Sequence, residues 1–186
     1  MEQNFIKEVV SNLINSLEVI ESKGIKNDYS FKIDCESLED YNYIDIRDSL
    51  EFKNIFENLN TLNKSPVLYW FEIISSTPRG LIRKQITEYS ENKISKTTPS
   101  LKKSFDINSN CLYVGKVKKG ISGRIIQHLG YYKVRRTQGL QLFHWTKGLD
   151  LKLKVHLYEF ENEIADIVSI FEIEMAKLKK PITGKH

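Results

Sequence analysis

The sequence predicts an α/β (α+β) fold in which short strands form one small sheet with helices packed against it. Two dense runs of apolar residues, 67–74 and 111–117, are typical of buried strands. Residues 151–158 alternate apolar with polar side chains, which predicts a third strand with one face in solvent. Apolar residues three and four positions apart predict helices over 120–129 and 163–180.

The first third of the chain is predicted to be mostly helical and accessory to this unit. Apolar residues recur at helical spacing over 2–23. A short strand is predicted at Tyr43–Ile46. Asp48 and Glu51 have the spacing of a capping box, which predicts a second helix from there. Residues 1–65 are therefore expected to form an acidic, mostly helical N-terminal extension.

Pro66 is the predicted boundary of a second domain, 66–186, because the sequence becomes densely apolar directly after it. Residues of about 75–110 form a polar insertion between the first two predicted strands, with a helix expected within Leu81–Tyr89. The insertion holds 7 basic and 3 acidic residues, a net charge of +4. A basic segment of this kind is suited to contact with a polyanion.

Charge is distributed unevenly along the chain. Residues 1–65 hold 7 Lys and Arg against 13 Asp and Glu, a net of −6, whereas residues 66–186 hold 21 against 11, a net of +10. Basic residues attract nucleic acid through counterion release, so the later part is the candidate for nucleic-acid contact. A solvated basic face without any partner would explain the same excess.

Composition and motifs exclude several other classes. The two cysteines, Cys35 and Cys111, lie outside any metal-binding spacing, which predicts buried, reduced thiols. No apolar run approaches the roughly 20 residues that span a bilayer, and the N-terminus does not resemble a leader, so we expect a cytoplasmic protein with no membrane partner. The phosphate-binding glycine loop, HExxH and GxSxG motifs are absent.

Two tyrosines occupy the first two predicted strands, Tyr69 in Val-Leu-Tyr-Trp and Tyr113 in Leu-Tyr-Val-Gly-Lys. Arg124 follows Tyr113 by 11 positions on the next predicted helix. His128 lies one turn beyond Arg124, so both project from the same helical face. Taken singly, each has a structural explanation: a buried tyrosine belongs to the core, and an arginine and a histidine to a solvated helix face.

The last predicted helix offers two candidate carboxylates, Glu172 and Glu174. Glu172 lies nine positions before Pro181, a register common in one nuclease family, and is the preferred candidate. With the tyrosines and the arginine, this order of residues resembles the GIY-YIG nuclease family over residues 66–186. The resemblance implies a small, mainly antiparallel three-stranded sheet flanked by helices, to which the N-terminal extension and the insertion are added.

Three departures from the family pattern are visible. Val67 stands where the first motif has glycine, which keeps the strand and its tyrosine. The two tyrosines are separated by 43 residues, far more than a short hairpin needs. Gly184 stands where the family commonly has an asparagine three residues after the proline, which leaves one expected hydrogen bond of the active site unaccounted for.

The resemblance implies a metal-dependent endonuclease that hydrolyses DNA phosphodiester bonds. Glu172 would hold one divalent cation, Mg²⁺ or another such as Mn²⁺. Arg124 would donate hydrogen bonds to the non-bridging phosphate oxygens. One of the two tyrosines or His128 would orient or deprotonate the attacking water, and the choice stays open; Lys116 is the candidate cation beside the tyrosine of its strand.

Basic and aromatic residues next to these elements are the candidates for DNA contact, through phosphates and base stacking. They are Lys118, Lys119, Tyr131, Lys133, Arg135 and Arg136. The predicted function is a restriction, defence or mobile-element endonuclease acting on double-stranded DNA. The alternative is a catalytically inactive nucleic-acid-binding module with the same fold. A palindromic target would need a homodimer, for which the N-terminal helices could serve as the interface.

Overall fold

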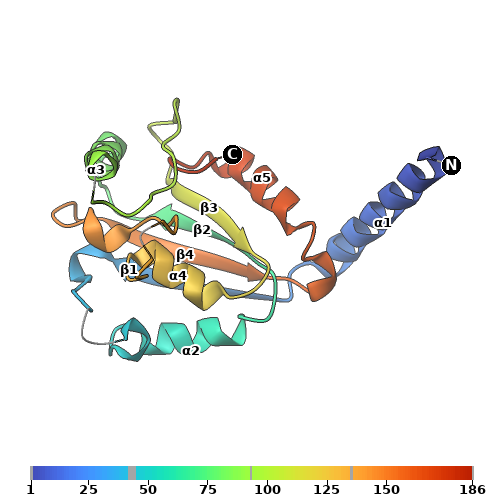
Figure 1. Ribbon diagram of the computed structural model, residues 1–186, viewed down its shortest axis with the longest axis horizontal. Helices are drawn as coiled ribbons and strands as arrows, with labels where there is room; N and C mark the ends of the chain where they lie inside the picture. Colours follow the sequence, from blue (N-terminus) through green and yellow to red (C-terminus); the bar gives the residue numbers. More distant parts are fainter. Residues whose placement is uncertain (1, 42–44, 93, 135, 186) are drawn as a thin grey trace.

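The computed structural model describes residues 2–41, 45–92, 94–134 and 136–185. These residues form one four-stranded antiparallel sheet and five α-helices (Figure 1). In chain order the elements are α1 (Glu2–Lys23), β1 (Asn27–Asp34), α2 (Lys53–Thr61), β2 (Val67–Ile73), α3 (Arg79–Glu91), β3 (Cys111–Val117), α4 (Ile121–Leu129), β4 (Lys152–Glu159) and α5 (Val168–Lys179). The strand order is β1-β4-β2-β3, so β1 and β3 are the two edges.

The α+β class is confirmed, but the sheet has four strands where three were predicted. The additional strand β1 lies in the N-terminal extension and pairs with β4 from Asn27 opposite Glu159 to Asp34 opposite Lys152. Polar residues alternate with its core residues, so the strand has no dense apolar run of the kind that identified the others. The sheet therefore draws strands from both sides of the predicted boundary at Pro66.

Helix α2 begins later than the capping box predicted. Asp48 ends a short 3₁₀ turn at Ile46–Asp48, and α2 starts at Lys53 without a side-chain cap. The carboxylate of Glu51 instead accepts hydrogen bonds from the hydroxyls of Ser37 and Tyr41. Glu51 therefore binds residues that are distant in the sequence and does not cap the helix. Residues 43 and 44 of the predicted strand Tyr43–Ile46 lie outside the described residues.

The larger core lies on the face of the sheet that is covered by α2 and α4. The sheet supplies alternate residues of each strand, among them Ile33, Tyr69, Phe71 and Val155, and all are at least 97% buried. The helices contribute the buried sides of their amphipathic surfaces. Because β2 is covered on both faces, nearly all of its side chains are buried, which explains its unbroken apolar run.

The opposite face of β2 and β3 is covered by α5. Leu68, Trp70 and Val114 pack there against the apolar side of α5 and the turn before it. Trp70 is stacked against His156 of β4 at a centroid distance of 4.5 Å, and the Lys179 ammonium lies 3.8 Å from its ring centroid. Two helices thus approach edge strand β3 from different faces of the sheet, α4 from one and α5 from the other.

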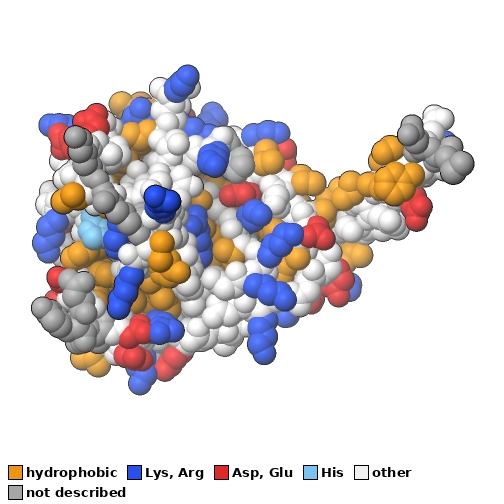
Figure 2. Space-filling view, in the orientation of Figure 1, with side chains coloured by type: hydrophobic (Ala, Val, Ile, Leu, Met, Phe, Trp, Pro, Cys, Tyr) orange, Lys and Arg blue, Asp and Glu red, His pale blue; other side chains and the backbone are white. Residues whose placement is uncertain are grey.

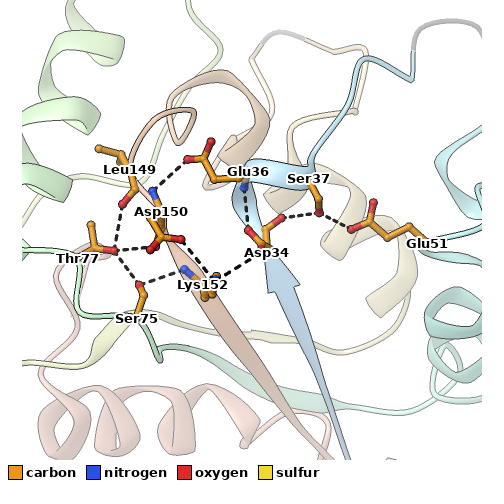
Figure 3. A network of polar contacts seen from close by, with 9 residues as sticks. All are labelled: Asp34, Glu36, Ser37, Glu51, Ser75, Thr77, Leu149, Asp150 and Lys152. Atoms are coloured by element: carbon orange, nitrogen blue, oxygen red, sulfur yellow. Dashed lines mark hydrogen bonds and ion pairs between the residues drawn. The ribbon is translucent and has the colours of Figure 1, made fainter.

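Polar networks close both ends of the sheet. At one end the buried carboxylate of Glu159 accepts hydrogen bonds from Lys26, Asn27 and Ser65. At the other end Lys152 lies between Asp34 and the loop before β4, and its backbone N–H donates to the hydroxyl of Ser75 (Figure 3). These contacts join segments from both sides of residue 66 into one body.

Two further features bear on the sequence predictions. Cys35 and Cys111 are free and buried, as predicted. Within the described ranges, the helices are all too short or too polar to cross a membrane.

Candidate functional site

Arg124 lies at the centre of a hydrogen-bonded cluster between α4 and the sheet. Its Nε donates to the Tyr69 hydroxyl at 3.0 Å and its Nη2 to the Tyr113 hydroxyl at 3.3 Å. Its Nη1 donates to the side chain of Gln127 at 2.8 Å and to the carbonyl of Gln138 at 2.6 Å. Four of the five guanidinium hydrogens are therefore engaged, and the described residues supply no acceptor for the second hydrogen of Nη2.

The Tyr69 hydroxyl is held from two sides in a fully buried position. It lies 3.0 Å from Nε2 of His128, whose Nδ1 accepts the backbone N–H of Leu140 at 3.2 Å. Since Nδ1 is an acceptor, the ring proton is assigned to Nε2, which donates to Tyr69. Tyr69 thus receives hydrogen bonds from both His128 and Arg124.

Burial makes both members of this pair poor proton carriers. Burial raises the pKa of Tyr69, and the effect outweighs the nearby Arg124 cation. Burial, assisted by the same cation, lowers the pKa of His128 well below its ordinary value. His128 is 0% exposed and neutral near pH 7. Tyr69 consequently holds Arg124 and His128 holds Tyr69, and neither of the two rings is exposed to solvent.

Gly115 explains how the two tyrosine rings approach each other. It lies directly opposite Tyr69 in the β2–β3 register, and Tyr113 is two positions away on the same face of β3. A Cβ on Gly115 would lie 2.5 Å from Cε1 of Tyr113 and 2.6 Å from the hydroxyl oxygen of Tyr69. The Tyr-x-Gly spacing therefore has a steric cause, because both rings occupy the space of the missing side chain.

A cleft of about 230 Å³ opens at the edge strand β3, lined by α5 and by the segment after α4. Tyr113 is 9% exposed and lines one wall, and Glu172 of α5 lines the other. The remaining lining residues are Pro99, Val114, Gln138, Gly184 and Lys185. Glu174 instead faces solvent and forms an ion pair with Lys177 at 2.6 Å. The structure thus brings Glu172, and not Glu174, to the tyrosine.

Gly184 lies against the ring of Tyr113 in a conformation suited to glycine. A Cβ at this position would be 3.8 Å from Cε2 of Tyr113, so there is room for a side chain. The φ of +121°, however, is a backbone conformation that residues other than glycine rarely adopt. Its N–H donates to the carbonyl of Ser100 at 2.9 Å. The position expected to carry an asparagine is therefore inside the cleft, and Lys185 is the next side chain to line it.

The predicted insertion forms one wall of the cleft. Pro99 lines it directly, and Gln138 donates to the carbonyl of the adjacent Thr98 at 3.3 Å. The N–H of Gly139 donates to the carbonyl of Thr97 at 3.1 Å. Sequence reasoning missed Pro99, Gln138 and Lys185, since they lie in irregular segments whose positions depend on these long-range hydrogen bonds.

Lys116 is not brought to the tyrosine of its strand. It lies opposite Leu68, on the sheet face that α5 covers, whereas Tyr113 and Gly115 share the other face with Tyr69. Within the described part of the chain it forms no hydrogen bond to Tyr113. The structure does not bring this lysine to the tyrosine, because residues three positions apart in a strand point to opposite faces.

The predicted DNA contacts fall into two groups. Lys118, Lys119, Lys133 and Arg136 are exposed, and Lys118 forms an ion pair with Asp166. Figure 2 shows Lys and Arg side chains on the face of the molecule that carries β3, α4 and α5. Arg135 lies outside the described residues.

Tyr131 was predicted to contact DNA, but its ring packs against other aromatic residues of the protein. Its ring lies 5.1 Å from Tyr41 and 5.2 Å from Phe143 between centroids, and its hydroxyl donates to the carbonyl of Glu39 at 2.8 Å. With Lys133 it borders a separate hollow of about 480 Å³. It does not line the cleft of Tyr113.

The donor set of the cleft is suited to a hard cation. The described residues include no group of three or more His, Cys, Asp or Glu that could form a metal cage. Mg²⁺ commonly takes one or two protein carboxylates and keeps several waters, and Glu172 supplies one such carboxylate in a solvent-accessible cleft.

Comparisons of the chain with protein-family models, curated proteins and solved structures found no match.

Proposed function

We propose that this chain is a cytoplasmic, metal-dependent endonuclease of the GIY-YIG type that hydrolyses phosphodiester bonds of double-stranded DNA. The observation that carries the proposal is that Tyr113 and Glu172 line one cleft and that Arg124 donates a hydrogen bond to the hydroxyl of that Tyr113. The cation, the hydroxyl and the carboxylate come from three different elements, and the resemblance to the GIY-YIG family predicted all three. A restriction, defence or mobile-element role follows from the same resemblance.

Each of these three side chains supplies one requirement of the reaction. Arg124 directs its remaining Nη2 hydrogen to a non-bridging phosphate oxygen and neutralises charge in the transition state. Tyr113 is the candidate to orient the attacking water or, as its phenolate, to accept the water's proton, because it lines the cleft while Tyr69 and His128 are fully buried. Glu172 holds Mg²⁺ or Mn²⁺, which supplies Lewis-acid stabilisation of the phosphoryl charge.

Nicking of supercoiled plasmid tests this proposal. The wild-type protein is incubated with Mg²⁺ or Mn²⁺ beside Arg124→Ala, Glu172→Gln and the matched control Glu174→Gln. We expect Arg124→Ala to lower the rate by about 10²–10³-fold, as for loss of one transition-state donor. Glu172→Gln should abolish nicking and Glu174→Gln should retain it. A wild-type protein that nicks with neither metal contradicts the proposal.

A second candidate is a nucleic-acid-binding module that lacks catalytic activity. It is favoured by Gly184, which puts no side chain where the family has an asparagine, although the position lines the cleft. Salt-dependent DNA binding without nicking under either metal would support this alternative. Absence of both binding and nicking would argue against both functions.

A further inference from the structure

A second hollow lies beside the cleft and is rich in lysine. It has a volume of about 400 Å³ and is lined by Lys102, Lys177 and Lys180, together with Ser104 and Asp106 among others. One oxygen of the Asp106 carboxylate already accepts a backbone N–H at 2.9 Å. We call it the lysine hollow. Lys177 also forms an ion pair with Glu174, and three ammonium groups against these two carboxylates still leave a net positive charge.

The lysine hollow shares its first wall with the cleft. Segments 99–102 and 181–185 run alongside each other, joined by hydrogen bonds such as Lys102 N to Ile182 O at 3.1 Å. One end of this pair, at Pro99, lines the cleft, and the other end, at Lys102, lines the lysine hollow. Three residues of extended chain cover roughly 10 Å.

The second wall is the same face of α5. Glu172 lines the cleft, and Ala176 and Lys180 line the lysine hollow. Glu172 and Ala176, four residues apart, lie on nearly the same face of α5, and Lys180 follows directly after the helix as its C-cap; from Glu172 to the helix end at Lys179 the rise is about 10 Å. Both walls therefore lead from the cleft to the lysine hollow over about the same distance, with the insertion on one side and α5 on the other.

We propose that the lysine hollow binds a backbone phosphate of the nucleic-acid strand that enters the cleft. The proposal rests on the proposed function, because it takes the cleft as the place of the scissile phosphate. Roughly 10 Å corresponds to about three nucleotides at 3.4 Å per nucleotide of a duplex strand. Lysine suits this role as a flexible point charge that binds phosphate without reading the base.

Fluorescence anisotropy with a labelled DNA duplex, in EDTA and over a range of salt, tests the proposal without catalysis. The variant Lys102→Gln/Lys177→Gln/Lys180→Gln is compared with Lys32→Gln/Lys84→Gln/Lys154→Gln, which removes the same charge from β1, α3 and β4. Each phosphate contact contributes about −0.9 to the slope of log K against log salt. We expect the first variant to lose about one to three units of slope and at least tenfold in affinity, and the second to resemble wild type.

Equal slopes for the two triple variants would overturn the lysine hollow as a phosphate site. If wild type nicks plasmid while those slopes are equal, the endonuclease proposal stands and the subsite alone is wrong. If wild type shows no salt-dependent binding, the proposed function and the subsite both fail.

A separate observation concerns α1, which projects from the body of the molecule (Figure 1). Its apolar side chains are 37–64% exposed, namely Phe5, Ile6, Val9, Val10, Leu13, Ile14, Leu17 and Val19. Only near its end does the helix pack against the core, through Ile20. A solvent-exposed helix of this length is marginal in water without a packed apolar face. The stripe is therefore a contact surface.

The charges beside the stripe fit a second copy of this chain. Lys7 and Glu21 lie 14 residues apart, at opposite ends of α1, yet only about 40° apart around its axis. We infer that two α1 helices pair antiparallel about a twofold axis, so that Lys7 faces the partner's Glu21 and the reverse contact repeats. Ile14 then lies at the axis, with Leu13 beside it. Seven of these half-exposed apolar residues, all except Val19, lie on this side of the helix and supply much of the roughly 800 Å² per partner of a standard interface.

Sedimentation equilibrium tests the antiparallel pair. Wild type should be a dimer, and Leu13→Asp should be a monomer with an unchanged circular dichroism spectrum of the body. Lys7→Glu should raise the dimer Kd by about tenfold, since two contacts become repulsive, and adding Glu21→Lys should restore it. Glu8→Lys, on the far side of the helix, is the control. A monomeric wild type, or Lys7→Glu without effect, overturns this inference.

Discussion

Gly115→Ala is the sharpest test of how the tyrosine pair is built. The new methyl group would lie 2.5 Å from Cε1 of Tyr113 and 2.6 Å from the hydroxyl oxygen of Tyr69. Ordinary contacts lie at 3.4–4 Å, so the rings must retreat by about 1 Å. Such a shift strains the core and lengthens both bonds from Arg124, now 3.0 and 3.3 Å.

The expected loss of stability follows from these contacts. Overpacking costs about 1–3 kcal/mol, and weakening hydrogen bonds to a charged group costs about 1–2 kcal/mol more. We expect the free energy of unfolding to fall by roughly 2–5 kcal/mol and the Tm by roughly 5–15 °C. The matched control is Gly123→Ala on α4, where a Cβ meets nothing within 4 Å. That substitution should be neutral or stabilise by about 0.5–1 kcal/mol, as alanine does in a helix.

Calorimetry and urea unfolding of the two variants measure this difference. The Tyr69→Phe background adds a second check, because it removes the hydroxyl oxygen that the methyl group meets. Gly115→Ala should cost about 1 kcal/mol less in that background than in wild type. If Gly115→Ala and Gly123→Ala unfold alike, the steric explanation of the Tyr-x-Gly spacing is refuted.

Three further predictions concern stability and reactivity. Since burial lowers the folded-state pKa of His128, the unfolded chain binds its proton more readily, and stability should fall as the pH drops below about 6.5. His128→Gln should remove part of that decline in urea midpoints between pH 7.5 and 5.5; an unchanged decline argues against it. Glu159→Gln should lower the free energy of unfolding by about 1–3 kcal/mol, because a buried acceptor of three hydrogen bonds is altered, whereas exposed Glu161→Gln should change it by less than about 0.5. Burial raises the pKa of the Cys35 and Cys111 thiols to about 12, so both should react with a disulfide reagent only as fast as the protein unfolds. Rapid labelling of the folded protein would contradict this.

The elements with strong periodicity were predictable from the sequence. Strands β2 and β3 lie between two layers, so their side chains are buried on both faces and the apolar runs stand out. Helix α1 matches its predicted range of 2–23, α3 extends the helix predicted within Leu81–Tyr89 to Arg79–Glu91, and α4 agrees within one residue. Helix α5 starts at Val168, after a 3₁₀ turn. Strand β1 was missed because its alternation is short and its polar half is charged.

The site was predictable only where the spacing of residues along the sequence determines which side chains meet. The order Tyr113, Gly115, Arg124 follows one strand into one helix, so local spacing fixes which side chains meet. The register against Pro181 chose Glu172, and the structure places that carboxylate in the cleft. Membership in the GIY-YIG family and the nuclease activity remain predictions.

The other parts of the site depend on contacts that spacing does not encode. Gln138 and Pro99 reach the cleft through hydrogen bonds between the insertion and the segment after α4. Tyr131 was taken as a free stacking residue, but long-range packing against Tyr41 and Phe143 encloses it. Each outcome required the positions of segments far apart in the chain.

The segment after α5 both covers the edge of the sheet and lines the cleft. Ile182 and Thr183 donate backbone hydrogen bonds to the carbonyls of Cys111 and Leu112, which covers the exposed edge of β3. The next residues, Gly184 and 185, line the cleft. Unpaired sheet edges are templates for aggregation. A substitution that loosens this segment would therefore expose the unpaired edge of β3 and, at the same time, displace the residues that line the cleft. Solubility and site integrity should therefore be lost in the same variants.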